Sequence, residues 1–197
     1  MTATIEVFPL GNADTTRLTL ADGRRVLFDF ADMGRSDSSD IDFDLESAVK
    51  NDLGSAPYRL PALCITHVDD DHCHGFGEVF WLEHAKKYQD DDRIKVDEFW
   101  VPAAAILEEG LTRDSRLVRE EAKHRLLEGK GVRVFSSPKI LEDWLVGKGL
   151  TLASRKDCIV NAGQAILDAR VVLEDLEGAQ KWTQTLGEKG CGEGAEK

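Results

Sequence analysis

One short segment of the chain carries most of the side chains that could bind a metal ion. Three histidines and three aspartates lie within residues 67–74, directly after the apolar residues 63–65. Adjacent carboxylates repel one another, and a bound divalent cation removes that repulsion by placing positive charge among them. Imidazole and carboxylate ligands together suit zinc, manganese or iron better than calcium, which prefers oxygen ligands alone. The segment 66–75, called the metal loop below, is therefore predicted to be the centre of a metal site.

The spacing within the metal loop allows more than one ion. His67, Asp69 and Asp71 are each two residues apart, so their side chains can point to the same side of an extended or turning loop. His72 is adjacent to Asp71, and a tight turn would let these two residues face a second ion. Two nearby ions can polarise a substrate and activate a water molecule together. The spacing therefore predicts a site for one or two divalent cations.

Residues 67–72, with the sequence His-Val-Asp-Asp-Asp-His, resemble the His-x-His-x-Asp-His motif of the metallo-β-lactamase superfamily. Asp69 stands where the common motif has its second histidine, and this variant resembles the hydrolase domains of bacterial DNA-uptake channel proteins. Residues 11–15 resemble the Gly-x-Gly-Asp-Ser/Ala turn of the family. Residues 26–30 resemble its strand that ends in a buried aspartate, here Asp29, which supports the metal loop.

The resemblance implies a role for each residue of the motif. His67 and Asp69 would serve a first metal position, and Asp71 and His72 a second. Asp71 would be both a metal ligand and the catalytic proton acceptor for the attacking water. Zinc is the ion that the resemblance favours, and the carboxylate of Asp69 adds manganese as an alternative because it suits a harder ion. His74 is open to several interpretations: an accessory ligand, a substrate contact, a helix cap or an exposed side chain.

The pattern of apolar residues predicts an α/β fold around the metal loop. Strands are expected at residues 4–8, 17–20, 26–30, 61–66, 98–101, 132–135 and 171–173. Helices are expected at residues 45–53, 76–88, 103–109, 115–128 and 140–146. The metal loop would lie at the carboxyl end of a buried strand, where sites in α/β sheets usually lie. The resemblance implies a metallo-β-lactamase-like αββα sandwich, of which this chain would hold the N-terminal half plus an insertion. A domain over residues 1–186 and a flexible glycine-rich tail over 187–197 are predicted.

The second half of the chain departs from the family pattern. Members of the family draw further ligands from that half: another histidine, a bridging aspartate after a glycine, and a final histidine. After His74 this chain has only His84 and His124, both in charged, helix-like stretches where solvent-exposed surface histidines are expected, and it has no Gly-Asp dipeptide. A truncated gene or fragment is the leading explanation, and a shortened, mononuclear or inactive relative is the alternative.

Composition and charge restrict the class of protein. The chain has 197 residues, of which 42% are apolar, and no apolar run of about 18 residues that could span a membrane. Its four cysteines are scattered and its N-terminus lacks the features of a signal peptide, so a reducing, cytoplasmic location is predicted. The net charge of −12, concentrated in the first half, disfavours broad binding to nucleic acid. It remains compatible with a small-molecule or single-stranded nucleic-acid substrate.

These observations predict a metal-dependent hydrolase whose metal-bound hydroxide attacks a phosphodiester, in a nucleotide or nucleic acid. The first alternative is a degenerate or truncated module that binds metal weakly without catalysis and acts through a partner. Such a half-domain would expose apolar strand edges and a sheet face, so a homodimer or a partner protein would cover it. A weaker alternative is hydrolysis of a lactone or thioester, since fold alone does not choose the substrate.

Overall fold

The computed structural model describes residues 2–11, 13–33, 43–135 and 139–160, and these form an α/β fold around one seven-stranded mixed sheet. The strands are β1 (Thr4–Val7), β2 (Thr16–Thr19), β3 (Arg25–Phe28), β4 (Arg59–Cys64), β5 (Lys95–Pro102), β6 (Val132–Phe135) and β7 (Ile159–Val160). The helices are α1 (Leu45–Leu53), α2 (Asp70–Cys73), α3 (Phe76–Val79), α4 (Ala103–Leu107), α5 (Arg113–Glu128) and α6 (Lys139–Gly147). Two short 3-10 helices, η1 (Lys86–Tyr88) and η2 (Leu152–Arg155), complete the described elements. The predicted α/β class is thus confirmed.

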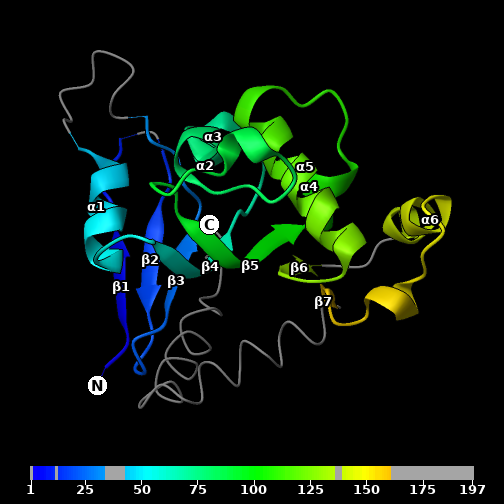
Figure 1. Ribbon diagram of the computed structural model, residues 1–197, viewed down its shortest axis with the longest axis horizontal. Helices are drawn as coiled ribbons and strands as arrows, with labels where there is room; N and C mark the ends of the chain where they lie inside the picture. The colour runs from blue at the N-terminus through cyan, green and yellow to red at the C-terminus, as the bar shows by residue number, and fades with distance from the viewer. Residues whose placement is uncertain (1, 12, 34–42, 136–138, 161–197) are drawn as a thin grey trace, which may run out of the picture.

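The strands lie in the sheet in the same order as in the sequence. β1, β2 and β3 form an antiparallel meander, and β3 to β7 are parallel. Because every parallel connection advances in the same direction and such crossovers are right-handed, the connecting helices must lie on one face. Figure 1 shows α2, α3, α4 and α5 gathered on that face of the sheet.

The core lies between the sheet and these helices. The register pairs Leu27 with Leu63, Leu63 with Phe99 and Phe99 with Val132, so these four side chains form one row across four strands. Each is at most 3% exposed. Since alternate residues of a strand face opposite sides, this row fixes which side of β3, β4, β5 and β6 meets the helices. The helix α5 covers the row with three fully buried residues, Val118, Ala122 and Leu126.

Helix α1 forms where the sequence predicts it. Asp44 caps its first turn, because the side chain accepts a hydrogen bond from the backbone of Ser47 at 2.9 Å. Leu45 and Val49, one turn apart, are buried against the core. Gly54 ends the helix with a φ of 95°, in the left-handed region that favours glycine.

The predicted helix over residues 76–88 is wrong. Only α3 and the short η1 are helical there, and the chain between them is held by contacts to distant parts of the sequence. The N–H of Trp81 donates to the carbonyl of Ile94 at 2.9 Å, and the Arg93 guanidinium donates to the carbonyl of Gly77 at 2.7 Å. Tertiary partners therefore take the backbone groups that a continuous helix would pair internally.

Two predictions lie outside the described residues: the strand over 171–173 and the tail over 187–197. The boundary of the predicted domain at residue 186 lies there as well. Within the described residues, no helix is both long enough and apolar enough to cross a membrane.

Candidate metal centre

The metal loop is positioned by two neighbouring parallel strands. Asp29 directly follows β3, and Thr66 follows β4 by two residues, so the parallel pairing brings them to the same edge of the sheet. The Asp29 carboxylate accepts hydrogen bonds from the Thr66 backbone N–H and from the Thr66 hydroxyl, each at 2.7 Å. The backbone of Asp29 has a φ of 57°, in the left-handed region that aspartate tolerates better than most residues. This conformation turns the chain at the end of β3 and directs the carboxylate into the loop.

His72 is held in one orientation by Asp29. Its side chain is only 10% exposed, and its Nδ1 lies 2.9 Å from Asp29 Oδ2. A carboxylate only accepts hydrogen bonds, so neutral His72 carries its proton on Nδ1 and a lone pair on Nε2. Metal-binding histidines are commonly fixed in this way by a carboxylate on their other ring nitrogen. Asp29 therefore stands where the sequence predicted a supporting aspartate.

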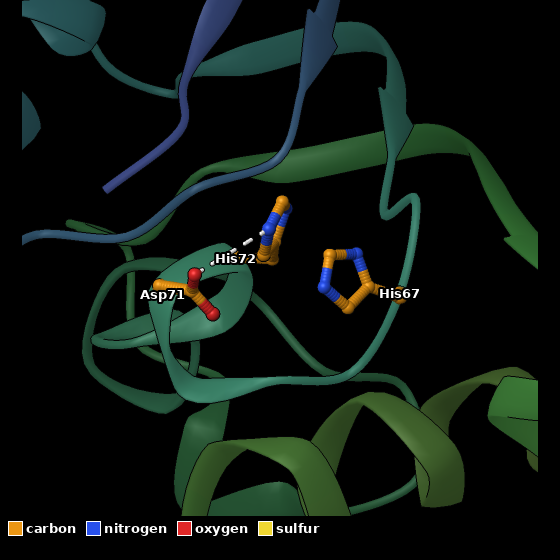
Figure 2. Close-up of side chains that lie close together, drawn as sticks. All are labelled: His67, Asp71 and His72. Atoms are coloured by element: carbon orange, nitrogen blue, oxygen red, sulfur yellow. Dashed lines mark ion pairs between the residues drawn. The ribbon is translucent and has the colours of Figure 1, made fainter. Parts of the chain in front are cut away.

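The structure brings three of the predicted ligands together. One ligand atom each from His67, Asp71 and His72 lies within 4.8 Å of the others, so this group could hold a metal ion. Figure 2 shows the Asp71 carboxylate directed toward His72, with the His67 ring beside it. The rings of His67 and His72 have centroids 3.6 Å apart. Because the side chains of His67 and Asp71 are 48% and 49% exposed, water and solutes reach this group.

Asp69 and His74 lie at the margin of this group. Asp69 is 74% exposed, and its Oδ2 is 3.3 Å from His67 Nε2. The Nδ1 of His74 lies 3.5 Å from the carboxylate of Asp70, one turn earlier along α2. Helix α2 begins directly after Asp69, so the alternation expected for residues 67, 69 and 71 ends there.

The donor set of the group fits a divalent cation. Two imidazoles and one carboxylate resemble the three-ligand sets of catalytic zinc sites, which keep a further position open. His72 supplies the strongest sign of fit: the ring is almost fully buried, yet its Nε2 has no hydrogen bond within the described residues. Its nearest charged neighbours are two carboxylate oxygens, at 3.7 Å from Asp71 and 3.8 Å from Asp14. A nitrogen lone pair that faces carboxylate oxygens is satisfied by a cation between them.

Asp14 was not predicted as a site residue, although the sequence contained a signal for its position. It lies in the turn 11–15, the segment that resembles the Gly-Asp turn of the family. Its backbone N–H donates to the carbonyl of Asp71 at 3.1 Å, which joins the turn to the metal loop. Nothing in the local pattern indicates that the carboxylate faces His72.

Helix α5 supports the other side of the metal loop. The Asp114 carboxylate accepts hydrogen bonds from the backbone N–H groups of Gly75 and Gly77, at 3.1 and 2.8 Å. The Cys73 thiol donates to the carbonyl of Asp69 at 3.2 Å and lies 3.5 Å from the Ser115 hydroxyl. Burial raises the pKa of the Cys73 thiol to about 11, and Cys73 is not one of the three residues of the metal group.

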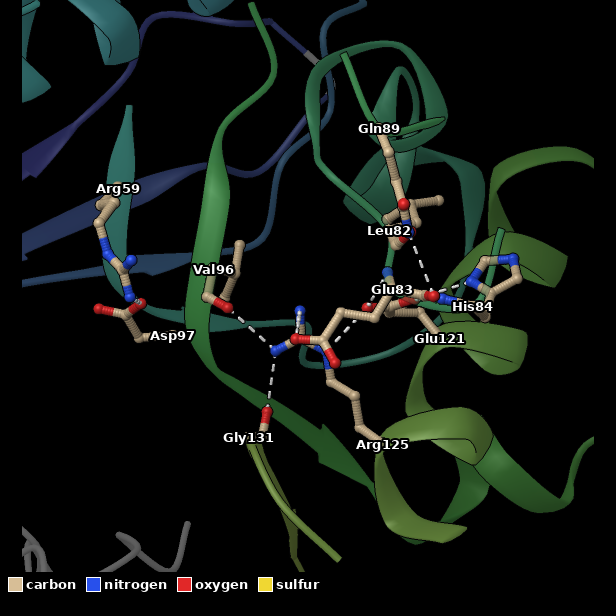
Figure 3. A network of polar contacts seen from close by, with 10 residues as sticks. All are labelled: Arg59, Leu82, Glu83, His84, Gln89, Val96, Asp97, Glu121, Arg125 and Gly131. Atoms are coloured by element: carbon tan, nitrogen blue, oxygen red, sulfur yellow. Dashed lines mark hydrogen bonds and ion pairs between the residues drawn. The ribbon is translucent and has the colours of Figure 1, made fainter. Parts of the chain in front are cut away.

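His84 is not the solvent-exposed surface histidine that the sequence predicted. Its side chain is 16% exposed, and its Nδ1 lies 2.7 Å from Glu121 on α5. Glu121 also accepts the backbone N–H of Glu83 and the Nε of Arg125 (Figure 3). This carboxylate binds the segment after α3 to α5, and neither His84 nor the partly exposed His124 joins the metal group.

The chain matches no protein-family model, no curated protein and no solved structure.

Proposed function

We propose that this chain is a metal-dependent hydrolase related to the metallo-β-lactamase superfamily, and that it acts on phosphodiester substrates. The observation that carries the proposal is the orientation of His72. Asp29 holds one nitrogen of this buried ring, while the other nitrogen faces Asp71 beside the His67 ring. An α/β sheet with its helices on one face and a site at the carboxyl ends of β3 and β4 also supports the resemblance.

A divalent cation bound by His67, Asp71 and His72 would polarise a phosphoryl oxygen and lower the pKa of a nearby water. Zinc fits the two imidazoles, and manganese is the alternative that the surrounding carboxylates favour. Positive charge is needed here for a second reason. Asp69 and Asp70 expose their carboxylates on the same loop, and these would otherwise repel an anionic substrate.

The residues of the centre would have different roles in hydrolysis. Asp71 is half-exposed and could accept the proton of the attacking water at its carboxylate. His67, also half-exposed, would bind the ion on the side that is open to substrate. Asp29 keeps His72 in place by accepting its Nδ1 proton and touches no substrate. The acidic surroundings favour a small or single-stranded substrate over a long duplex.

The test is metal content together with turnover of a simple diester, bis(p-nitrophenyl) phosphate. We expect the purified chain to bind zinc or manganese and to hydrolyse the diester only when loaded. Asp71→Ala should lose most of the bound metal and the turnover, because it removes both a ligand and a proton acceptor. Asp70→Ala is the matched control: it removes one exposed carboxylate from the same helix outside the metal group, and it should keep both. A chain that binds no metal, or an Asp71→Ala variant with unchanged turnover, contradicts the proposal.

The second candidate is a non-catalytic module that acts through a partner protein. The face of the sheet opposite the described helices carries Trp100 and Phe135, whose ring centroids are 5.9 Å apart. Partly exposed aromatic side chains on one sheet face favour contact with another protein. Bound metal without turnover of diester, lactone or thioester substrates would favour this candidate.

A further inference from the structure

We infer that Asp14 is a fourth protein ligand and that it completes a one-ion centre with His67, Asp71 and His72. The inference rests on the proposed metal binding and specifies its ligands and its stoichiometry. It differs from the pairing that the resemblance implies, in which the residues of the loop divide between two ions.

The distances around His72 Nε2 are those expected between ligands of a common ion. This nitrogen lies 3.8 Å from Asp14 Oδ2 and 3.7 Å from Asp71 Oδ2. Two atoms that each bind one ion at about 2.0–2.2 Å are about 3.0–4.2 Å apart, depending on the angle between them. The ring therefore already stands at a suitable separation from both carboxylates, without forming a hydrogen bond to either.

The environment of His72 favours a cation at this position. The side chain is nine-tenths buried and cannot turn to solvent, since Asp29 holds its Nδ1 at 2.9 Å. Its Nε2 lone pair faces oxygens that can only accept hydrogen bonds. A cation among Asp14, Asp71 and Nε2 replaces a repulsive contact with three attractive ones.

The backbone around Asp14 is fixed, although its carboxylate is free to turn. The Asp14 N–H donates to the carbonyl of Asp71, and the next residue, Thr15, is 1% exposed. The Thr15 hydroxyl accepts a hydrogen bond from the backbone of Ala31 at 3.3 Å, close to where Asp29 leaves β3. The Asp14 side chain itself is 80% exposed, so a bound ion can draw it in without moving the backbone.

The charges and the number of ligands also suit one ion. Two carboxylates neutralise a divalent cation, and two neutral imidazoles add no charge. Zinc can accept a fifth ligand and manganese a fifth and a sixth, so an ion with these four ligands still has room for water and substrate. All four ligands lie between residues 14 and 72. The centre would therefore need none of the downstream ligands that the resembled family uses and this chain lacks.

The test compares the full chain with Asp14→Asn and with Asp70→Asn, a matched control that removes the same charge from an exposed position of α2 outside the metal group. Zinc is titrated against a chromophoric chelator, and manganese binding is measured separately. We expect one ion per wild-type chain. Asp14→Asn should bind the ion at least about 10-fold more weakly, because losing even a residue that only orients a ligand usually lowers metal affinity by about that factor. Asp70→Asn should bind like the wild type. Asp14→Glu should recover part of the loss, because it restores a carboxylate.

The outcomes separate this inference from the proposed function. A wild-type chain that binds no metal overturns both. If the wild-type chain binds one ion and Asp14→Asn binds it with the same affinity, only the role of Asp14 is overturned. Two ions per wild-type chain overturn the one-ion centre. Because the Asp14 side chain is exposed, Asp14→Asn should fold like the wild type. A melting temperature that matches the wild-type value in the absence of metal will show this.

Discussion

Asp29 is the residue on which the orientation of the metal loop depends most directly. Its carboxylate accepts hydrogen bonds from both the backbone and the hydroxyl of Thr66 and also holds His72 Nδ1. Its positive φ is uncommon for a residue other than glycine and has an energetic cost. A backbone in this conformation persists because the contacts on the carboxylate outweigh that cost.

Asp29→Asn should weaken metal binding by about 10–100-fold, the usual effect of losing a partner that orients a ligand. The amide replaces one acceptor oxygen with an N–H₂ group, which would face donors of Thr66 or His72 and turn the ring. Zinc affinity measured by competition with a chelator checks the result. Asp22→Asn, in the turn between β2 and β3, is the control for loss of one carboxylate. Affinity unchanged in Asp29→Asn would show that His72 is not held by this contact.

The sequence alone could identify part of this site. The residue types and spacing indicate His67, Asp71 and His72, and the structure brings these three together. The spacing also groups Asp69 with them, but α2 starts directly after it and ends the alternation. Asp14 could not be predicted as a neighbour of His72, because their proximity depends on contacts between segments far apart in the sequence, such as the hydrogen bond from the Asp14 N–H to the carbonyl of Asp71.

At the scale of elements, α5 is joined to the segment after α3 by a buried ionic network. Glu121 and Arg125 are 1% and 2% exposed, and Arg125 donates to the carbonyls of Val96 and Gly131, each at 3.0 Å. Burial alone would raise the pKa of Glu121. The hydrogen bond from His84, the charge of Arg125 and further hydrogen bonds outweigh burial and lower this pKa to about 2.

Glu121→Gln should lower the free energy of unfolding by about 3–5 kcal/mol, because it leaves the charge of Arg125 buried without its partner. Urea unfolding at neutral pH measures the change. Glu120→Gln, at a more exposed position on the same helix, is the control and should change stability little. A loss below about 1 kcal/mol in Glu121→Gln would mean that the network contributes little to holding these elements together.

The same network predicts the dependence of stability on acid. The pKa of Glu121 is lower in the folded chain, about 2, than its ordinary value of 4.5. Its contribution is therefore fully present above the unfolded value and is lost as the pH falls from about 5 toward 2. In Glu121→Gln this part of the acid dependence should be missing.

The long-range bonds of this network also show why a helix was wrongly predicted over residues 76–88. Glu121, some 37 residues away in sequence, accepts the backbone N–H groups of Glu83 and His84. Helical spacing of apolar residues is a local property and carries no information about such a partner. Where the pairing is local, as in α1 with its Asp44 cap and Gly54 end, the prediction was confirmed.

At the scale of the molecule, the sheet has two different faces. The helices described here cover the face with Leu63 and Phe99, while Cys64 and Trp100 point to the other. The pattern of apolar residues predicted strands where β1 to β6 lie, but it predicted none at β7. It did not predict the order of the strands or which face the helices cover. Those follow from the direction and handedness of the connections.

Metal binding should raise the stability of the whole chain if the centre forms only in the folded state. Zinc at about 100 times its dissociation constant should add about 2.7 kcal/mol to the free energy of unfolding. A thermal melt with and without zinc measures this. Asp71→Ala should melt at the same temperature with and without the ion. A wild-type melting temperature that does not change with zinc would contradict preferential binding of the ion to the folded chain.

The metal loop also pairs with the segment after β3 through its backbone. The N–H of Phe30 donates to the carbonyl of His72, and the N–H of Asp32 donates to that of His74, each at 3.0 Å. These contacts close a loop of about forty residues. Closing the loop costs conformational entropy, and it must happen before the ligands can converge. The ion should therefore be captured late in folding rather than nucleate it. Hydrogen exchange at the amides of Phe30 and Asp32 would report the closing of this loop residue by residue.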